Sequence, residues 1–184
     1  MLLYEPIKLH EPLTIQPATA WGKIPTILLD LIERAKLNTN VCLEFGVEYG
    51  YSTSALANYF TKVIGVDTFD GDIHSGIKNN HFEQTKQILS IYPNIELVKS
   101  TYQDFIVNNE NYYDLIHIDI VHTYQDTLDC GEWSIQHADC VIFHDTESFH
   151  NVKLAVTDLA SKYNLYFYNF VESCGLGILT KRMI

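Results

Sequence analysis

The fold of this chain is decided by one stretch, Val41-Cys42-Leu43-Glu44-Phe45-Gly46-Val47-Glu48-Tyr49-Gly50. An apolar run ends in a carboxylate, and two glycines bracket the turn that follows. The next residues, Ser52-Thr53-Ser54-Ala55-Leu56-Ala57, favour the start of a helix. A strand, a glycine turn and a helix in this order form the usual nucleotide-binding site of an open α/β sheet. A plain glycine turn without a ligand is the alternative for this segment taken alone.

The turn carries carboxylates where a phosphate-binding loop carries glycine. A dinucleotide loop has the pattern G-x-G-x-x-G, which lets a pyrophosphate approach bare backbone at a helix N-terminus. Here Glu48 occupies the place of the second glycine, and Glu44 stands just before the turn. Two carboxylates repel a pyrophosphate but accept a ligand that carries an amine and a sulfonium and no phosphate. S-adenosylmethionine (SAM) is such a ligand, and we expect it to be the cofactor.

Composition limits the class of protein. The chain has 184 residues, 47% of them hydrophobic, which is enough for one domain with a sizeable core. The formal net charge is −11 and no basic cluster stands out, so neither nucleic acid nor an anionic membrane is an expected partner. No apolar stretch reaches membrane-spanning length and no secretion signal is recognised, so we expect a cytoplasmic protein.

The cysteines fit that expectation. They lie at positions 42, 130, 140 and 174, and none of them form a C-x-x-C pair. Three stand in apolar, strand-like surroundings. We therefore expect reduced and mostly buried thiols, with a Cys130–Cys140 disulfide as the alternative.

Strand-like and helix-like segments alternate along most of the chain. Residues 1–20 hold three of the five prolines and no clear period, and we expect an arm or lid outside the core. Residues 21–184 are expected to form a single domain. Expected strands cover residues 41–46, 62–66, 95–99, 114–119, 139–144, 165–170 and 177–180. Expected helices cover residues 24–37, 52–60, 81–91, 102–107, 123–137 and 151–163.

This alternation predicts an α/β fold with a doubly wound, mostly parallel seven-stranded sheet covered by helices. The middle strands are short and apolar, as strands buried on both faces should be. Only Glu172-Ser173-Cys174-Gly175 separates the last two strands, too few residues for a crossover helix, so we expect an antiparallel hairpin there. A parallel sheet that ends in an antiparallel strand is typical of the SAM-dependent methyltransferase variant of the Rossmann-like fold.

In such sheets the ligand lies beyond the carboxyl ends of the strands. Asp67 closes the second expected strand, where a carboxylate can accept hydrogen bonds from both hydroxyls of a ribose. NAD enzymes bind the ribose in the same way, so Asp67 favours an adenosine ligand but does not distinguish SAM from NAD. Alternatively, Asp67 caps a helix or a turn. Thr101 and Gln103 follow the third strand, where polar side chains commonly meet the adenine edge. Thr101 alternatively caps the next helix.

Four ionisable residues follow the fourth and fifth expected strands. If these strands are neighbours, about 4.8 Å apart, Asp119 and Asp145 converge at one rim with His122 and His144 beside them. Two carboxylates suit Mg²⁺ or another hard divalent ion, which could hold acceptor hydroxyls and lower the pKa of one. His122 or His144 could then remove its proton. In the alternative, Asp119 orders the cofactor loop, Asp145 caps the next helix and no metal binds. We expect His117 to be a structural core histidine.

Together these segments resemble the class I SAM-dependent methyltransferases of the methyltransferase 24 type, over roughly residues 38–160. The resemblance is carried by Glu44 to Gly50, Val66-Asp67-Thr68-Phe69 with Gly71-Asp72-x-His74-x-Gly76, His117-Ile118-Asp119-x-x-His122-Thr123-Tyr124, and Phe143-His144-Asp145-Thr146. It implies that Glu44, Gly46 and Gly50 contact the methionine part of SAM. Asp67 would hold the ribose, and Asp119 and Asp145 would lie at the reaction centre. The expected cofactor-binding residues are Glu44, Gly46, Glu48, Gly50, Ser52, Asp67, Thr68, Phe69, Thr101, Gln103 and Asp119.

The resemblance also implies an acceptor class. Many relatives occur beside glycosyltransferases, which suggests methyl transfer to an oxygen of a sugar or glycan, or of another small polar acceptor. Ile120 departs from the family, which often has glycine there, and could narrow the acceptor pocket. The chain lacks a substrate domain, so residues 1–20, the loop of residues 70–80 and a second subunit of a homodimer are expected to build the acceptor site.

Other functions fit less of the sequence. An NAD-dependent oxidoreductase agrees with Asp67 but not with Glu48 in the turn. A serine hydrolase lacks its G-x-S-x-G elbow. A non-catalytic accessory module with the cofactor-binding fold is a further alternative. It would have no physical need for four ionisable groups at one rim of the sheet. We therefore expect a methyltransferase with Asp119, His122 and His144 as catalytic residues and with Asp119 and Asp145 as ligands of any metal.

Overall fold

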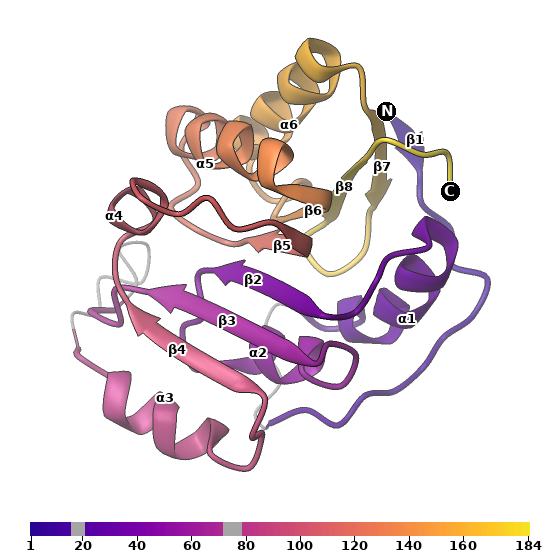
Figure 1. Ribbon diagram of the computed structural model, residues 1–184. Helices are drawn as coiled ribbons and strands as arrows, with labels where there is room; N and C mark the ends of the chain where they lie inside the picture. Colours follow the sequence, from indigo (N-terminus) through magenta and orange to yellow (C-terminus); the bar gives the residue numbers. More distant parts are fainter. Residues whose placement is uncertain (16–20, 72–78) are drawn as a thin grey trace.

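The computed structural model describes residues 1–15, 21–71 and 79–184, and in these ranges eight strands form one sheet with helices on both faces (Figure 1). The strands are β1 (Leu2–Leu3), β2 (Val41–Phe45), β3 (Lys62–Asp67), β4 (Ile95–Lys99), β5 (Tyr113–Ile118), β6 (Ala138–His144), β7 (Tyr166–Phe170) and β8 (Leu176–Thr180). The helices are α1 (Ile24–Ala35), α2 (Tyr51–Leu56), α3 (Phe82–Leu89), α4 (Tyr102–Ile106), α5 (Tyr124–His137) and α6 (His150–Tyr163).

The strand order confirms the doubly wound fold. It runs β1-β7-β8-β6-β5-β2-β3-β4. All neighbouring pairs are parallel except those of β8, which is antiparallel to both β6 and β7. The chain turns from one half of the sheet to the other between β2 and β5, and a ligand of an open sheet binds at this kind of switch point. The expected antiparallel hairpin is the β7–β8 pair.

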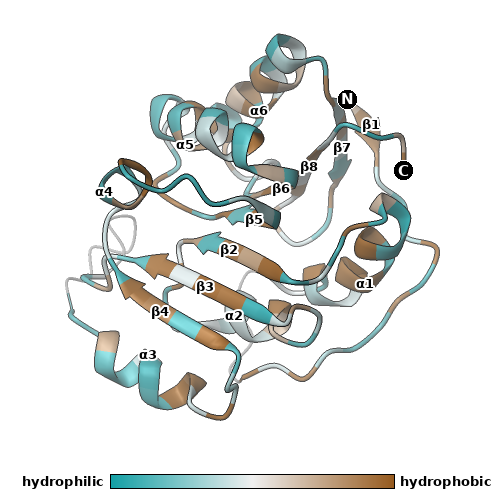
Figure 2. Ribbon diagram, in the orientation of Figure 1, coloured by the Kyte–Doolittle hydropathy of each residue, from teal (hydrophilic) through white to brown (hydrophobic). Residues whose placement is uncertain are grey.

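Consecutive residues of the central strands face opposite sides of the sheet, and both sides are buried. One core lies under α1 and α2 and includes Cys42, Leu115 and Cys140. The other lies under α5 and α6 and includes Ile116 and Cys130. All four cysteines are free, and Cys130 and Cys140 belong to opposite faces of the sheet, which excludes a disulfide between them. In Figure 2 strands β3 and β4 are largely brown, while α5 and α6 also carry teal turns.

The N-terminal segment is packed more closely than we expected from its prolines. Residues 2–3 add an eighth strand beside β7, a pairing too short to leave a period in the sequence. Tyr4 is 2% exposed, and its hydroxyl donates to Asp30 of α1 over 2.7 Å. Farther along, Asn58 donates to the carbonyl of Leu13. The expectation of an arm outside the core is therefore wrong for Tyr4, while residues 5–15 run over the surface beside α1 and α2 (Figure 1).

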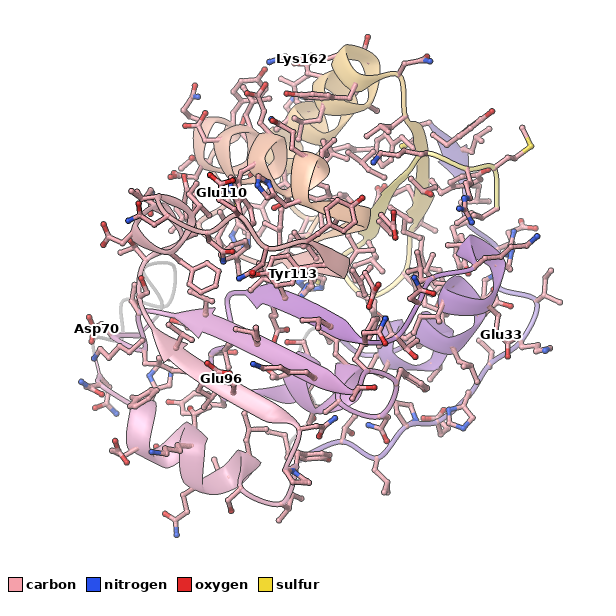
Figure 3. The ribbon with its side chains drawn as sticks, viewed as in Figure 1. Glu33, Asp70, Glu96, Glu110, Tyr113 and Lys162 are labelled. Carbon is pink, nitrogen blue, oxygen red and sulfur yellow. The ribbon has the colours of Figure 1, made fainter. Side chains whose placement is uncertain are left out.

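Charged side chains lie mainly on the outside. Glu33, Asp70 and Lys162 are at the periphery of Figure 3. Lys8 pairs with Glu33 over 2.9 Å, and Lys99 pairs with Asp70 over the same distance. Exposed pairs of this kind contribute little to stability. Within the described ranges, the longest helices have 14 residues and none is long and apolar enough to cross a bilayer.

Candidate active site

The glycine turn after β2 touches the end of β5. Gly46 has φ 90°, and a Cβ placed on it would lie 1.7 Å from the carbonyl oxygen of Asp119. Only glycine allows this approach of the two backbones. Gly50 also has a left-handed backbone, with φ 87°, and a Cβ there would meet Leu89 of α3 at 2.5 Å. The glycines thus bring the predicted cofactor turn directly against the predicted reaction centre.

Glu48 is held in the turn by its backbone. Its φ is 51°, a left-handed value that residues with a side chain rarely adopt. Its N–H donates to Asp67 over 2.9 Å, and its carbonyl accepts from the fully buried Thr85 over 3.0 Å. The side chain itself is exposed. The carboxylate therefore lies at the surface of the turn, and its contact with the cofactor stays a prediction.

Glu44 lies deeper than its predicted role suggests. It is fully buried, and one carboxylate oxygen accepts from the hydroxyl of Thr53 while the other lies 2.9 Å from Nδ1 of His117. His117 is also fully buried, so its assignment as a core histidine is confirmed. Glu44 thus ties β2 to β5 and α2 from beneath the turn. Its contact with the methionine part of SAM stays a prediction, as does that of Ser52, which is buried in the first turn of α2.

Asp67 organises the turn from the next strand. One carboxylate oxygen accepts from the N–H groups of Val47 and Glu48 over 2.8 and 2.9 Å, and the other accepts from Phe69 over 2.7 Å. Within the described residues, Asp67 therefore has its alternative role, which is to cap the turn. Phe69 is fully buried in a small apolar cluster with Val47 and Leu89, and Thr68 is partly exposed beside it. Ribose binding by Asp67 stays a prediction.

The residues after β4 are engaged in helix capping. Thr101 is the N-cap of α4, where its hydroxyl oxygen accepts from the N–H of Asp104 over 3.1 Å. Gln103 is exposed, and its amide lies 3.5 Å from a carboxylate oxygen of Asp126 on α5. A role of Thr101 and Gln103 at an adenine edge stays a prediction. Residues 72–78, which include His74, and residues 16–20 lie outside the described residues.

The four ionisable residues expected at the rim meet there, because β5 and β6 are parallel neighbours. Nδ1 of His144 lies 3.1 Å from Asp119 and 3.4 Å from Asp145. Nε2 of His122 lies 2.8 Å from Asp145 and 3.7 Å from Asp119. Asp145 directs its carboxylate to the two histidines, and α6 has no side-chain cap. Its expected alternative role as a helix cap is therefore absent.

Hydrogen bonds and ion pairs among the four rim residues shift their pKa values. Burial would lower the pKa of His122, but hydrogen bonds with Asp119 and Asp145 raise it to about 9. The same balance raises the pKa of His144 to about 10. Burial would raise the pKa of the two carboxyls, yet the histidines hold the pKa of Asp119 and of Asp145 below their usual value. Without another cation, both imidazoles carry a proton near neutral pH.

The same donor set is suited to a metal ion. Asp119, His144 and Asp145 each offer a ligand atom, and these atoms all lie within 4.8 Å of one another. Two carboxylates and one imidazole are common ligands of divalent ions in proteins. A small hollow of about 10 Å³, room for about one water molecule, adjoins the cluster. It is lined by Ile118, Asp119, Ile120, His122, Thr127, Phe143, His144 and Val152. Ile120 is one of these lining residues, and its narrowing of an acceptor pocket stays a prediction.

Three further contacts at the rim had no signal in the sequence. The ring of His122 stacks on Phe149 with centroids 3.9 Å apart. The indole of Trp21 is 2% exposed, and its ring centroid lies 4.7 Å from that of His117 and 5.9 Å from that of His144. Nε2 of His144 lies 3.2 Å from the carbonyl oxygen of Ser173. The residue types do not reveal which backbone carbonyl lies beside His144. Trp21 is far from the motifs along the sequence, so its contacts could not be predicted either.

The fold and the rim define a class of protein: a doubly wound domain with a carboxylate-bearing glycine turn beside a cluster of acids and bases. Residues 43–146 match the family described as a methyltransferase domain, and this match spans more than half of the chain. The chain belongs to this family, the class I SAM-dependent methyltransferases of the methyltransferase 24 type. No curated protein matches the sequence.

Solved structures share the fold at low identity. An O-methyltransferase from Bacillus cereus in complex with SAH has a TM-score of 0.59 and 15% identity over 90% of this chain and 83% of that chain. An rRNA methylase from Streptococcus thermophilus has a TM-score of 0.59 and 16% identity over 81% and 92% of the two chains. The N-methyltransferase NodS from Bradyrhizobium japonicum WM9 has a TM-score of 0.60 and 13% identity over 87% and 94%. These neighbours share the fold and differ in their acceptors.

Proposed function

We propose that this methyltransferase transfers the methyl group of SAM to a hydroxyl oxygen of a small polar acceptor, such as a sugar or glycan hydroxyl. The observation that carries the proposal is the junction of the glycine turn with the acid–base rim, where Gly46 touches the backbone of Asp119. A cofactor on the turn would place its methyl group near His122 and His144. The net charge of −11 favours a small neutral or cationic acceptor over a polyphosphate.

The proposed reaction is an in-line displacement. The acceptor oxygen attacks the methyl carbon, the carbon–sulfur bond breaks, and the sulfonium becomes a neutral thioether. The acceptor hydroxyl loses its proton, and we assign that proton to His122, with Asp119 and Asp145 stabilising the imidazolium that forms. Phe149 orients the imidazole by stacking on its face. The protein otherwise contributes by holding the two reactants in line.

His122 must be neutral to act as a base, whereas its pKa is raised to about 9 by the two carboxylates. We propose that a divalent cation on Asp119 and Asp145 supplies the missing positive charge. Such a cation would lower the pKa of His122 by repulsion, and it would hold and acidify an acceptor hydroxyl. A hard ion such as Mg²⁺ is the simplest choice for two carboxylates.

The cofactor contacts belong to the same proposal. Glu44, Gly46, Glu48, Gly50 and Ser52 would surround the methionine part of SAM. On the adenosine side, Asp67, Thr68, Phe69, Thr101 and Gln103 would surround the ribose and adenine. Both carboxylate oxygens of Asp67 already accept backbone N–H groups, and the oxygen that accepts only from Phe69 would use its second lone pair for a ribose hydroxyl.

Substitution at the rim tests the proposal. His122→Ala is expected to lose turnover by a factor of roughly 10² to 10⁴ while calorimetry still detects SAM binding. Asp119→Ala is expected to lose turnover as well. His150→Ala, at an exposed site at the start of α6, is the control with normal turnover. Normal turnover in His122→Ala would disprove the base assignment, and failure of the wild type to bind SAM would favour a non-catalytic accessory module.

A further inference from the structure

His144 is placed between two kinds of hydrogen-bond acceptor. It is the last residue of β6, and its side chain is 3% exposed. Nδ1 faces Asp119 at 3.1 Å and Asp145 at 3.4 Å. Nε2 faces the carbonyl oxygen of Ser173 at 3.2 Å. Both ring nitrogens therefore point at oxygen atoms that cannot donate a proton.

This placement limits the states of the ring. A carbonyl oxygen only accepts, so Nε2 must carry a hydrogen. Nδ1 faces two carboxylates and so needs a positive partner, which is either its own proton or a metal ion. A metal-binding histidine characteristically donates its other N–H to a carbonyl or carboxylate, which fixes the tautomer and aims the lone pair. The contact of His144 with Ser173 has this form.

The carbonyl of Ser173 is held in place independently of His144. Ser173, Cys174 and Gly175 have three consecutive left-handed φ values, 55°, 68° and 91°. The carbonyl of Cys174 accepts from the N–H of Glu147 over 2.8 Å. The hydroxyl of Ser173 accepts from the N–H of Lys23 over 2.8 Å. The β7–β8 turn is thus anchored to the rim and to the start of α1, and it presents a fixed acceptor to Nε2.

We propose that Nδ1 of His144 is the third protein ligand of the divalent cation, and that this nitrogen makes the site prefer a first-row transition ion such as Mn²⁺ or Co²⁺ over Mg²⁺. The inference rests on the metal-assisted part of the proposed function. Ligands bound at about 2.1 Å and at right angles lie about 3.0 Å apart, close to the separations of Nδ1 from the two carboxylates. Imidazole favours transition ions, whereas Mg²⁺ takes oxygen donors.

The neighbouring residue does not offer an oxygen ligand in place of the imidazole. Thr146 directly follows Asp145 but is 1% exposed, and its hydroxyl donates to Asn169 over 2.6 Å. Asn169 also donates to Glu147. This buried network turns Thr146 away from the cluster. His144 therefore remains the third donor beside the two carboxylates.

Metal titration of the full chain, without SAM or acceptor, tests the inference. Calorimetry is expected to give tighter binding for Co²⁺ and Mn²⁺ than for Mg²⁺, with a visible absorption band for bound Co²⁺. His144→Asn replaces the nitrogen donor by an amide oxygen. It is expected to weaken Co²⁺ binding roughly 10- to 100-fold and to change Mg²⁺ binding much less. The control His150→Asn should bind each ion as the wild type does. Equal preference for the ions in wild type and His144→Asn would overturn the inference.

A second measurement uses the wild type alone, in case His144→Asn unfolds. Long-range nitrogen–proton NMR spectra of chain labelled with ¹⁵N-histidine are recorded with and without Zn²⁺, a diamagnetic probe ion. The Nδ1 resonance of His144 is expected to shift while Nε2 keeps its proton. An Nδ1 resonance unchanged at saturating Zn²⁺ would overturn the inference. Metal binding through His144 in a chain that fails to bind SAM would contradict the proposed function and still support the ligand assignment.

Discussion

Glu48 has an energetically costly left-handed backbone in the glycine turn after β2. A left-handed backbone costs a residue with a side chain about 1–2 kcal/mol, and such strain persists only where the surroundings impose it. Here Asp67 and Thr85 fix the N–H and the carbonyl of Glu48 from two other elements. Glycine would fit the turn more easily, so we infer that the carboxylate is kept for the cofactor.

Glu48→Gly tests this inference. The change removes the left-handed penalty but adds about 0.5–1 kcal/mol of backbone entropy in the unfolded chain. We expect the free energy of unfolding to stay equal or to rise by up to about 1 kcal/mol, and the affinity for SAM to fall. Lys36→Gly is a matched control, because Lys36 is exposed and has φ 53° at the C-terminus of α1. Thermal unfolding and calorimetry should show a similar stability change in both variants and weaker SAM binding only in Glu48→Gly. Unchanged SAM affinity in that variant would remove Glu48 from the site.

Among the strands, β2 is flanked at both ends by backbone hydrogen bonds to carboxylates of the neighbouring strands. Asp67 of β3 accepts from Val47 and Glu48 beyond the carboxyl end of β2. Asp114 of β5 accepts from Asn40 and Val41 at the amino end, over 2.7 and 2.9 Å. The two contacts are chemically alike, but only the first lies at the ligand-binding edge of the sheet.

This symmetry yields a paired prediction. Asp67→Asn leaves a single acceptor oxygen, so amide hydrogen exchange at Val47 and Glu48 should accelerate and SAM binding should weaken by about 1–3 kcal/mol. Asp114→Asn should accelerate exchange at Asn40 and Val41 by a similar factor and leave SAM binding unchanged. Exchange measured by NMR, with calorimetry on the same samples, checks both variants. SAM binding that weakens equally in both would indicate general loosening of β2 rather than a specific effect of the turn.

In the molecule as a whole, the N-terminal segment is held against the domain by hydrogen bonds to the buried carboxylate of Asp30. Asp30 accepts from the hydroxyl of Tyr4 and from the N–H groups of Ile7 and Lys8, and it pairs with Arg34. Burial would raise the pKa of Asp30, but these hydrogen bonds outweigh burial and hold the pKa below its usual value. The ionised form of Asp30 therefore stabilises the packed segment.

The sign of this shift predicts a pH dependence. Because the folded pKa is lowered, the stabilisation by Asp30 is fully present above its unfolded pKa of about 4 and is lost as the pH falls through the lower folded value. We expect Asp30→Asn to lower the free energy of unfolding by about 1–3 kcal/mol at pH 7. The difference from the wild type should shrink in acid. Denaturant unfolding of both chains at neutral and acidic pH measures it, and a difference that grows in acid would contradict the account.

The sequence was sufficient for the order of strands and helices from residue 24 onward, because apolar strands and amphipathic helices leave distinct periods. Convergence of Asp119 and Asp145 could also be predicted, since both close neighbouring parallel strands. Strand β1 could not be predicted, because its two residues are too few to show an alternation of apolar and polar positions. The contacts of Glu44 with Thr53 and of His144 with the carbonyl of Ser173 depend on packing between distant segments. Such contacts have no signature in residue type or spacing.

Calorimetric titration of the wild-type chain with SAM, and in parallel with NAD, is the decisive test of SAM binding by this domain. The carboxylates of the turn and the family of the chain predict that SAM binds at one site per chain, and that NAD does not bind because its pyrophosphate would face Glu48. Binding of NAD without binding of SAM would show that the domain is not a SAM-dependent enzyme.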